Sequence, residues 1–196
     1  MAGSKRRCLV CIALAVLALT STAYAQQLPT TLKDDEFWRL VADLSETGGT
    51  FPQQFMSNED SAQFVIPALK QATKPGGVYV GVGSEQNFTY IAAIRPRLAF
   101  VVDIRRDNVF EHLMYKALFE MSDSRADFVS RLFSRKRPAG LDNATPVKAL
   151  FEAYRLIETD ASFYEANLRA VLDRLTKDHG FPLTDADRTS VTQAMN

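Results

Sequence analysis

The chain has 196 residues, which is enough for one domain with a hydrophobic core. Its 46% hydrophobic and 23% charged residues are ordinary values for a globular protein and argue against general disorder. The formal net charge is zero, so the composition implies no basic face for nucleic acid and no acidic tail.

The first 25 residues follow the order of a secretory signal peptide. Lys5 begins a basic triplet, Cys8 to Leu19 is a short apolar run, and Ala23-Tyr24-Ala25 is a small-x-small cleavage pattern. The apolar run is shorter than the ~20 residues that a membrane-spanning helix needs. We therefore predict that residues 1–25 are cleaved, which leaves no stable membrane span. The mature chain would begin at Gln26 and be exported, either periplasmic or secreted.

Cleavage would remove three basic residues and both cysteines. The mature chain then carries 20 basic and 23 acidic side chains, a net charge of −3. Without cysteine it cannot form disulfides, thiolate metal sites or a cysteine nucleophile. The two histidines, His112 and His179, have no partner at ligand spacing, so the sequence predicts no metal site.

The mature chain is expected to open with a helical lead-in. Acidic residues at 34–36 and apolar residues at helical spacing predict a helix from Asp34 to about Leu44, which Gly48-Gly49 breaks. Ser57 and Asp60 have the pattern of an N-cap for a second helix. Pro67 is expected to kink or shorten that helix.

Two β-rich runs then flank a helical segment. Val78–Val82 and Leu98–Ile104 predict strands, and residues 85–94 predict the helix between them. The near-continuous apolar character of the runs is typical of parallel strands that are covered on both faces. Together these elements form a βαβ unit, which is right-handed almost by rule.

After Asp103 the sequence predicts helices only. Apolar stripes mark helices within 109–121, 128–133, 147–157 and 163–175, Thr145-Pro146 should begin the third, Gly180 should end the fourth, and Thr184 should cap a last one. Doubly wound sheets typically have ~5–6 strands, and only two are found here. We therefore expect an incomplete Rossmann-like α/β three-layer fold, with residues 26–196 as the N-terminal part of a longer domain. The alternative is a small helical protein with a vestigial sheet.

One group of residues has the pattern of a ligand-binding site. Gly81 and Gly83 lie where the first strand turns into a helix, and Asp103 ends the second strand, 20 residues after Gly83. Glycines at such a turn let the backbone approach a ligand, and the helix N-terminus presents free N–H groups. An acid at that separation is suited to the ribose hydroxyls of a nucleoside. The alternatives are a tight turn without a ligand and a carboxylate that caps the next turn.

The segment Lys74 to Arg106 reads KPGGVYVGVGSEQNFTYIAAIRPRLAFVVDIRR. It resembles the first nucleoside-binding motifs of class I methyltransferases, and still more an uncharacterised bacterial family of methyltransferase-like Rossmann proteins. The resemblance covers roughly residues 37–141. It implies S-adenosylmethionine as cofactor, with Gly81 and Gly83 in the cofactor loop and Asp103 at the ribose. Where the methyltransferase pattern has an acid, this chain has Tyr79; Glu85 can supply that carboxylate from the loop or block an incoming nucleoside.

Two functions follow as hypotheses. The first is a methyltransferase-like protein that binds S-adenosylmethionine or a related nucleoside, and whether it is an enzyme stays open. The second is an exported, non-catalytic Rossmann-like module that binds a small polar ligand or a protein partner. Export favours the second, because activated cofactors are made in the cytoplasm. Substrate, catalytic residues and oligomeric state are not predicted.

For several other charged and polar groups the sequence allows structural roles. Arg105 and Arg106 can hold a phosphate or carboxylate, or pair with acids on the following helix. Asn87 is expected to satisfy helix N–H groups, and the basic loop 135–137 is expected to be a solvated connector.

Overall fold

The computed structural model describes residues 29–49 and 61–196. The chain divides into two units, residues 1–31 and 32–196, and every element named below belongs to the second. The predicted signal peptide with its cleavage before Gln26, and the predicted cap at Ser57, lie outside the described residues. Those two statements stay predictions.

The lead-in is helical, as expected. Helix α2 spans Asp34–Leu44, and the backbone N–H of Lys33 donates to Glu36 Oε2 at 3.1 Å. A 3₁₀ turn, η1 (Ala62–Val65), runs into α3 (Ile66–Ala72), and Pro67 is in the first turn of α3. Pro67 thus does not kink an α-helix: α3 begins beside it and has seven residues, which agrees with the expected shortening. Proline is tolerated in a first turn, because its missing N–H has no intrahelical acceptor there.

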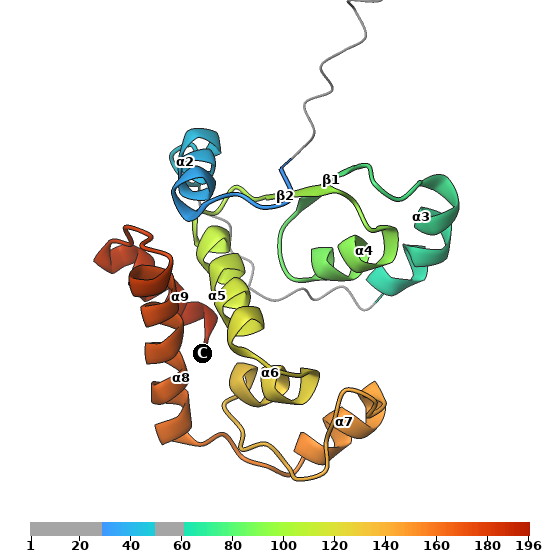
Figure 1. Cartoon of the computed structure of the whole chain (residues 1–196), viewed down its shortest axis with the longest axis vertical. Coiled ribbons are helices and arrows are strands. Elements are labelled where there is room, and N and C mark those ends of the chain that lie inside the picture. The colour runs from blue at the N-terminus through green and yellow to red at the C-terminus, as the bar shows by residue number, and fades with distance from the viewer. Residues whose placement is uncertain (1–28, 50–60) are drawn as a thin grey trace, which may run out of the picture. The chain divides into compact units, whose positions relative to one another are not determined.

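The βαβ unit has the predicted elements. Strand β1 (Val78–Val82) and strand β2 (Leu98–Val102) pair in parallel, and α4 (Gln86–Ile94) connects them (Figure 1). The register runs from Val78 opposite Leu98 to Val82 opposite Val102. Beyond β2, the N–H of Gly49 donates to Ile104 O at 2.8 Å, so the segment after α2 lies alongside this extension.

One face of this sheet is open, which contradicts the prediction that both faces are covered. Val80 and Val82 expose 66% and 68% of their surface, and Val102 exposes 49%. The face that carries Tyr79 and Gly81 is turned toward α4, because Tyr79 hydrogen-bonds to Asn87 of that helix. The helices that follow β2 do not cover the other face within the described part of the chain; they pack on one another.

The remaining elements are helical, and the main core surrounds one of them. They are α5 (Asp107–Met121), α6 (Arg125–Leu132), α7 (Val147–Tyr154), α8 (Ala161–Asp173), a π-helical turn η2 (Arg174–Asp178) and α9 (Asp185–Ala194). Helix α5 packs against α6, α8, η2 and α9. Buried α5 residues such as Phe110, Met114 and Leu118 meet Val171 and Val191 from α8 and α9. A smaller core joins α6 and α7 through Ala126, Val129, Leu150 and Tyr154.

Capping explains where these helices begin and end. Asp160 caps α8 by accepting from Phe163 N, and Thr184 caps α9 by accepting from Asp187 N. Helix α7 begins at Val147, after Pro146, so it starts one residue later than predicted. Gly180 has φ +67 after η2, which confirms it as the stop of that segment.

The described part of the chain is thus a mixed α/β, helix-rich protein with eight α-helices and one small parallel sheet of two strands. Among residues 29–49 and 61–196, no helix has the length and apolarity to cross a bilayer.

Candidate functional site

The loop after β1 is held in a defined conformation. Gly83 has φ +88, a value that a residue with a side chain rarely adopts, and its N–H donates to Val102 O at 3.0 Å. The Gly83 carbonyl accepts from Asn108 Nδ2 at 3.0 Å and lies 3.1 Å from His112 Nε2. Because a carbonyl only accepts, this nitrogen of His112 carries the proton. The N-terminal half of α5 therefore fixes the glycine loop.

Asp103 lies beside Gly83, at the adjacent strand end. A Cβ built on Gly83 would be 3.9 Å from Asp103 Oδ2. Asp103 Oδ1 accepts from the backbone N–H of Arg105 at 2.7 Å, and the Arg105 guanidinium contacts both carboxylate oxygens at 3.3 and 3.4 Å. Both side chains are about nine-tenths buried. The carboxylate thus caps the next turn, and a ribose would have to compete with Arg105 for it.

Gly81 serves packing inside the βαβ unit. A Cβ there would collide with Asn87 Oδ1 and with the Tyr79 ring. The Tyr79 hydroxyl donates to Asn87 Oδ1 at 2.6 Å, and Asn87 Nδ2 donates to Val82 O and Ser84 O. Burial raises the pKa of Tyr79, with a further contribution from Tyr90. Asn87 therefore braces the loop from α4 and does not cap the helix as expected.

Glu111 is a further residue of this site, and the sequence did not reveal it. Its side chain exposes 1% of its surface, and neither carboxylate oxygen accepts a hydrogen bond from the described residues. Burial is the main cause that raises its pKa to about 8; Glu85 and Asp103 raise it further, and Arg105 acts in the opposite direction. Glu111 is therefore protonated at neutral pH.

Glu85 and His112 complete the surroundings of Glu111. Glu85 is half-buried at the start of α4, and it acts electrostatically on Glu111, His112 and Tyr115. Burial lowers the pKa of His112, which keeps its ring neutral against the Gly83 carbonyl. Within the described part of the chain, Glu85, Asp103 and Arg105 thus all act electrostatically on Glu111, and Arg105 pairs with Asp103.

The structure brings together the predicted residues Gly83, Glu85 and Asp103, and it adds Asn108, Glu111 and His112 from α5. A signal for the added residues is present in the sequence: polar side chains at 108, 111 and 112 interrupt the inner face of a helix that is otherwise apolar. The apolar stripe of the helix alone does not reveal these three residues. Arg106 lies apart from the site, because it pairs with Asp187 of α9 at 3.3 Å.

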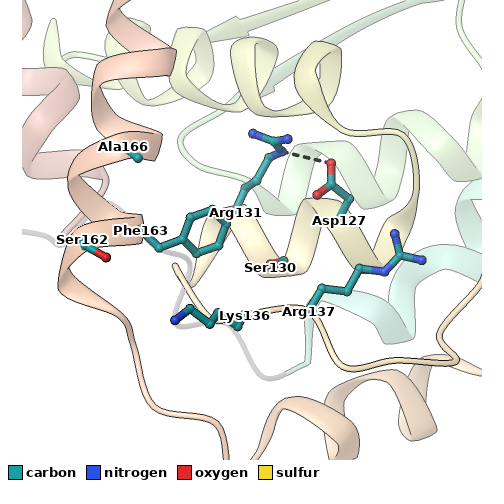
Figure 2. Close-up of a pocket in the computed structure, with 8 residues that line it drawn as sticks. All are labelled: Asp127, Ser130, Arg131, Lys136, Arg137, Ser162, Phe163 and Ala166. Carbon is teal, nitrogen blue, oxygen red and sulfur yellow. Dashed lines mark hydrogen bonds and ion pairs between the residues drawn. The ribbon is translucent and has the colours of Figure 1, made fainter.

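A concave region separate from this site lies between α6, the basic loop and α8. It is an open hollow of about 560 Å³, and Figure 2 shows Arg131, Lys136 and Arg137 around it. Each of these cations already has a partner: Arg131 pairs with Asp127, Lys136 with Asp160, and Arg137 donates to Leu141 O. Hydrogen bonds from Lys136, Ser162 and Phe163 N lower the pKa of Asp160. The hollow is lined by cations, but these cations already bind partners within the described chain.

The described residues contain no group of three His, Cys, Asp or Glu side chains arranged to hold a metal ion.

Fold and site define a helix-rich α/β protein whose polar groups gather at the carboxyl ends of two parallel strands. A family model, described as a domain of unknown function (DUF7790), matches residues 54–179. The chain belongs to this family. The match includes β1, α4, β2 and α5, and therefore the whole candidate site. No curated protein and no solved structure matches the chain.

Proposed function

We propose that the carboxyl edge of the β1–α4–β2 unit binds a nucleoside of the S-adenosylmethionine type, in a methyltransferase-like, Rossmann-like fold. One observation carries the proposal. Gly83 turns at positive φ directly beside Asp103 at the ends of adjacent parallel strands, so that a Cβ on Gly83 would be 3.9 Å from Asp103 Oδ2. In open α/β sheets, ligands bind at this edge, where a helix N-terminus also offers N–H groups.

The charge of the site supports the same class of ligand. Among the described residues, Glu85 and Asp103 raise the pKa of Glu111 and only Arg105 lowers it, so acidic groups outnumber basic ones and favour a ligand with positive charge. S-adenosylmethionine carries a sulfonium and an ammonium group. Methyl transfer from it relies mainly on positioning, so ligand binding is the first step to test.

A specific observation favours the second candidate, a non-catalytic binding module. Both oxygens of Asp103 are already engaged by Arg105, so the acid is satisfied without a ribose. In that case the glycine loop and Asp103 serve the turn, and the protein binds another small polar ligand or a protein.

Calorimetric titration with S-adenosylmethionine, S-adenosylhomocysteine and NAD separates these candidates. If the site holds a ribose, Asp103→Asn should weaken binding roughly tenfold to a hundredfold, because a hydrogen bond to a charged group is worth about 1.5–3 kcal/mol. Asp43→Asn, at an exposed position of α2, is the matched control and should bind normally.

Gly83→Ala tests the loop, with Gly140→Ala as its control. Both glycines have positive φ, at +88 and +78, so both substitutions strain the backbone, but only Gly83 lies at the site. Gly83→Ala alone should reduce binding. Binding of NAD in place of the other two would change the cofactor and keep the site. No heat from a folded protein with any of the three would overturn the proposal in favour of the non-catalytic module.

A further inference from the structure

Three buried acceptor atoms on one face of α5 lack donors. Asn108 Oδ1 and both carboxylate oxygens of Glu111 accept no hydrogen bond from any residue that the structure describes. The two residues expose 2% and 1% of their surface and stand three positions apart, so their side chains share one helix face. We call these three atoms the acceptor cluster. Buried acceptors without donors are destabilising and rare, so such a cluster is a feature that a ligand would explain.

The neighbours of the acceptor cluster define what could satisfy it. The donors nearest in sequence, Asn108 Nδ2 and His112 Nε2, are both directed at the Gly83 carbonyl. The guanidinium of Arg105 is engaged with Asp103. Glu85 and Asp103 add further negative charge, and Tyr115 lies one turn along α5. A group with several N–H donors and a positive charge complements this environment.

We propose that the acceptor cluster binds a protonated amine of the ligand held by the Gly83 loop, and that this amine replaces the proton on Glu111. The inference rests on the proposed function, because Asn108, which carries one of these atoms, also holds that loop. The balance of the step is simple: Glu111 loses one proton to solvent, and the carboxylate formed pairs with the ammonium. Because Glu111 exposes only 1% of its surface, the residues that cover it have to move to admit the amine.

Proton release gives a direct readout on the full chain. S-adenosylmethionine carries an α-ammonium group, whereas 5′-methylthioadenosine has the same nucleoside without it. Titration in two buffers of different protonation heat should show that the first ligand releases close to one proton at pH 6–7 and the second releases none. By linkage, the affinity for S-adenosylmethionine should rise about tenfold between pH 6 and pH 7, and that for methylthioadenosine should stay constant.

Glu111→Gln should abolish the proton release and weaken S-adenosylmethionine binding about tenfold or more, without affecting methylthioadenosine. Glu165→Gln, at an exposed position of α8, is the control and should behave as the unmodified chain. The proton count of the unmodified chain decides the question even if the Gln variant fails to fold. If both ligands bind without proton release, this inference is wrong and the nucleoside site stands. If neither binds, both are wrong.

Discussion

Glu111 couples the stability of the fold to pH. Its pKa is raised to about 8 in the folded chain, mainly by burial, from an ordinary value of 4.5. A raised acid pKa means that the folded state holds the proton more tightly than the unfolded state. The stability contributed by the neutral carboxyl is thus complete below pH 4.5 and is lost as the pH rises toward 8.

Glu111→Gln removes this titration and keeps the shape of the side chain. We expect the free energy of unfolding of the variant, relative to the unmodified chain, to increase between pH 4.5 and 8 by at most about 1.4 kcal/mol per pH unit. Urea unfolding at several pH values measures the difference. A constant difference across this range would show that Glu111 titrates normally.

At the residue scale, the sequence points to the candidate site but not to the contacts that each residue makes there. Gly83 and Asp103 were found from their spacing along the βαβ unit, which is a local feature. The contact of Gly81 with Tyr79 and Asn87, and the pairing of Asp103 with Arg105, depend on side-chain rotamers. Spacing does not determine rotamers, so ligand binding and internal packing looked alike in the sequence.

At the scale of the elements, helix α9 begins with a capping box. The Thr184 hydroxyl accepts from Asp187 N at 3.2 Å, and Asp187 Oδ2 accepts from Thr184 N at 2.9 Å. Asp187 also pairs with Arg106, so this cap ties α9 to the start of α5.

Thr184→Ala should lower the free energy of unfolding by about 1 kcal/mol, because it leaves a helix N–H without its acceptor. The control is Thr189→Ala, at an exposed position of the same helix. It should be neutral or slightly stabilising, since alanine is the better helix former. Urea unfolding compares the two. Equal losses would mean that the cap contributes nothing specific.

The elements themselves were largely predictable. Both strands, the helix between them and the cap of α9 follow from apolar periodicity and local polar signals. The prediction that the apolar runs form strands covered on both faces was wrong. The residue types of Val80 and Val82 indicate a strand, but they do not indicate which elements cover its face. The exposure of that face depends on how helices α5 to α9, which come later in the chain, pack.

For the whole chain, export is a prediction from the sequence alone. The Ala23-Tyr24-Ala25 pattern should direct cleavage so that the mature protein begins at Gln26. N-terminal sequencing of the protein from an expressing cell checks this. Substitution of Ala25 by a bulky residue should block cleavage, and a mature protein that still begins at Met1 would contradict the prediction.

At the scale of the whole described chain, apolar side chains lie either in a closed helical core or on an open sheet face. Val191 of α9 is fully buried, whereas Val80 of β1 exposes 66% of its surface. The same truncation therefore has different consequences at the two positions. Val191→Ala removes two buried methyl groups and should lower the free energy of unfolding by on the order of 1–3 kcal/mol. Val80→Ala should cost less than about 1 kcal/mol.

Urea unfolding of both variants, at two protein concentrations, measures how much of the sheet face is covered in solution. If the chain is monomeric with the face open, Val80→Ala stays mild and its midpoint does not depend on concentration. A loss at Val80 as large as that at Val191 would mean that another surface covers the face. If the midpoint of the unmodified chain also rises with concentration, that surface belongs to a second copy, because only association makes unfolding depend on protein concentration.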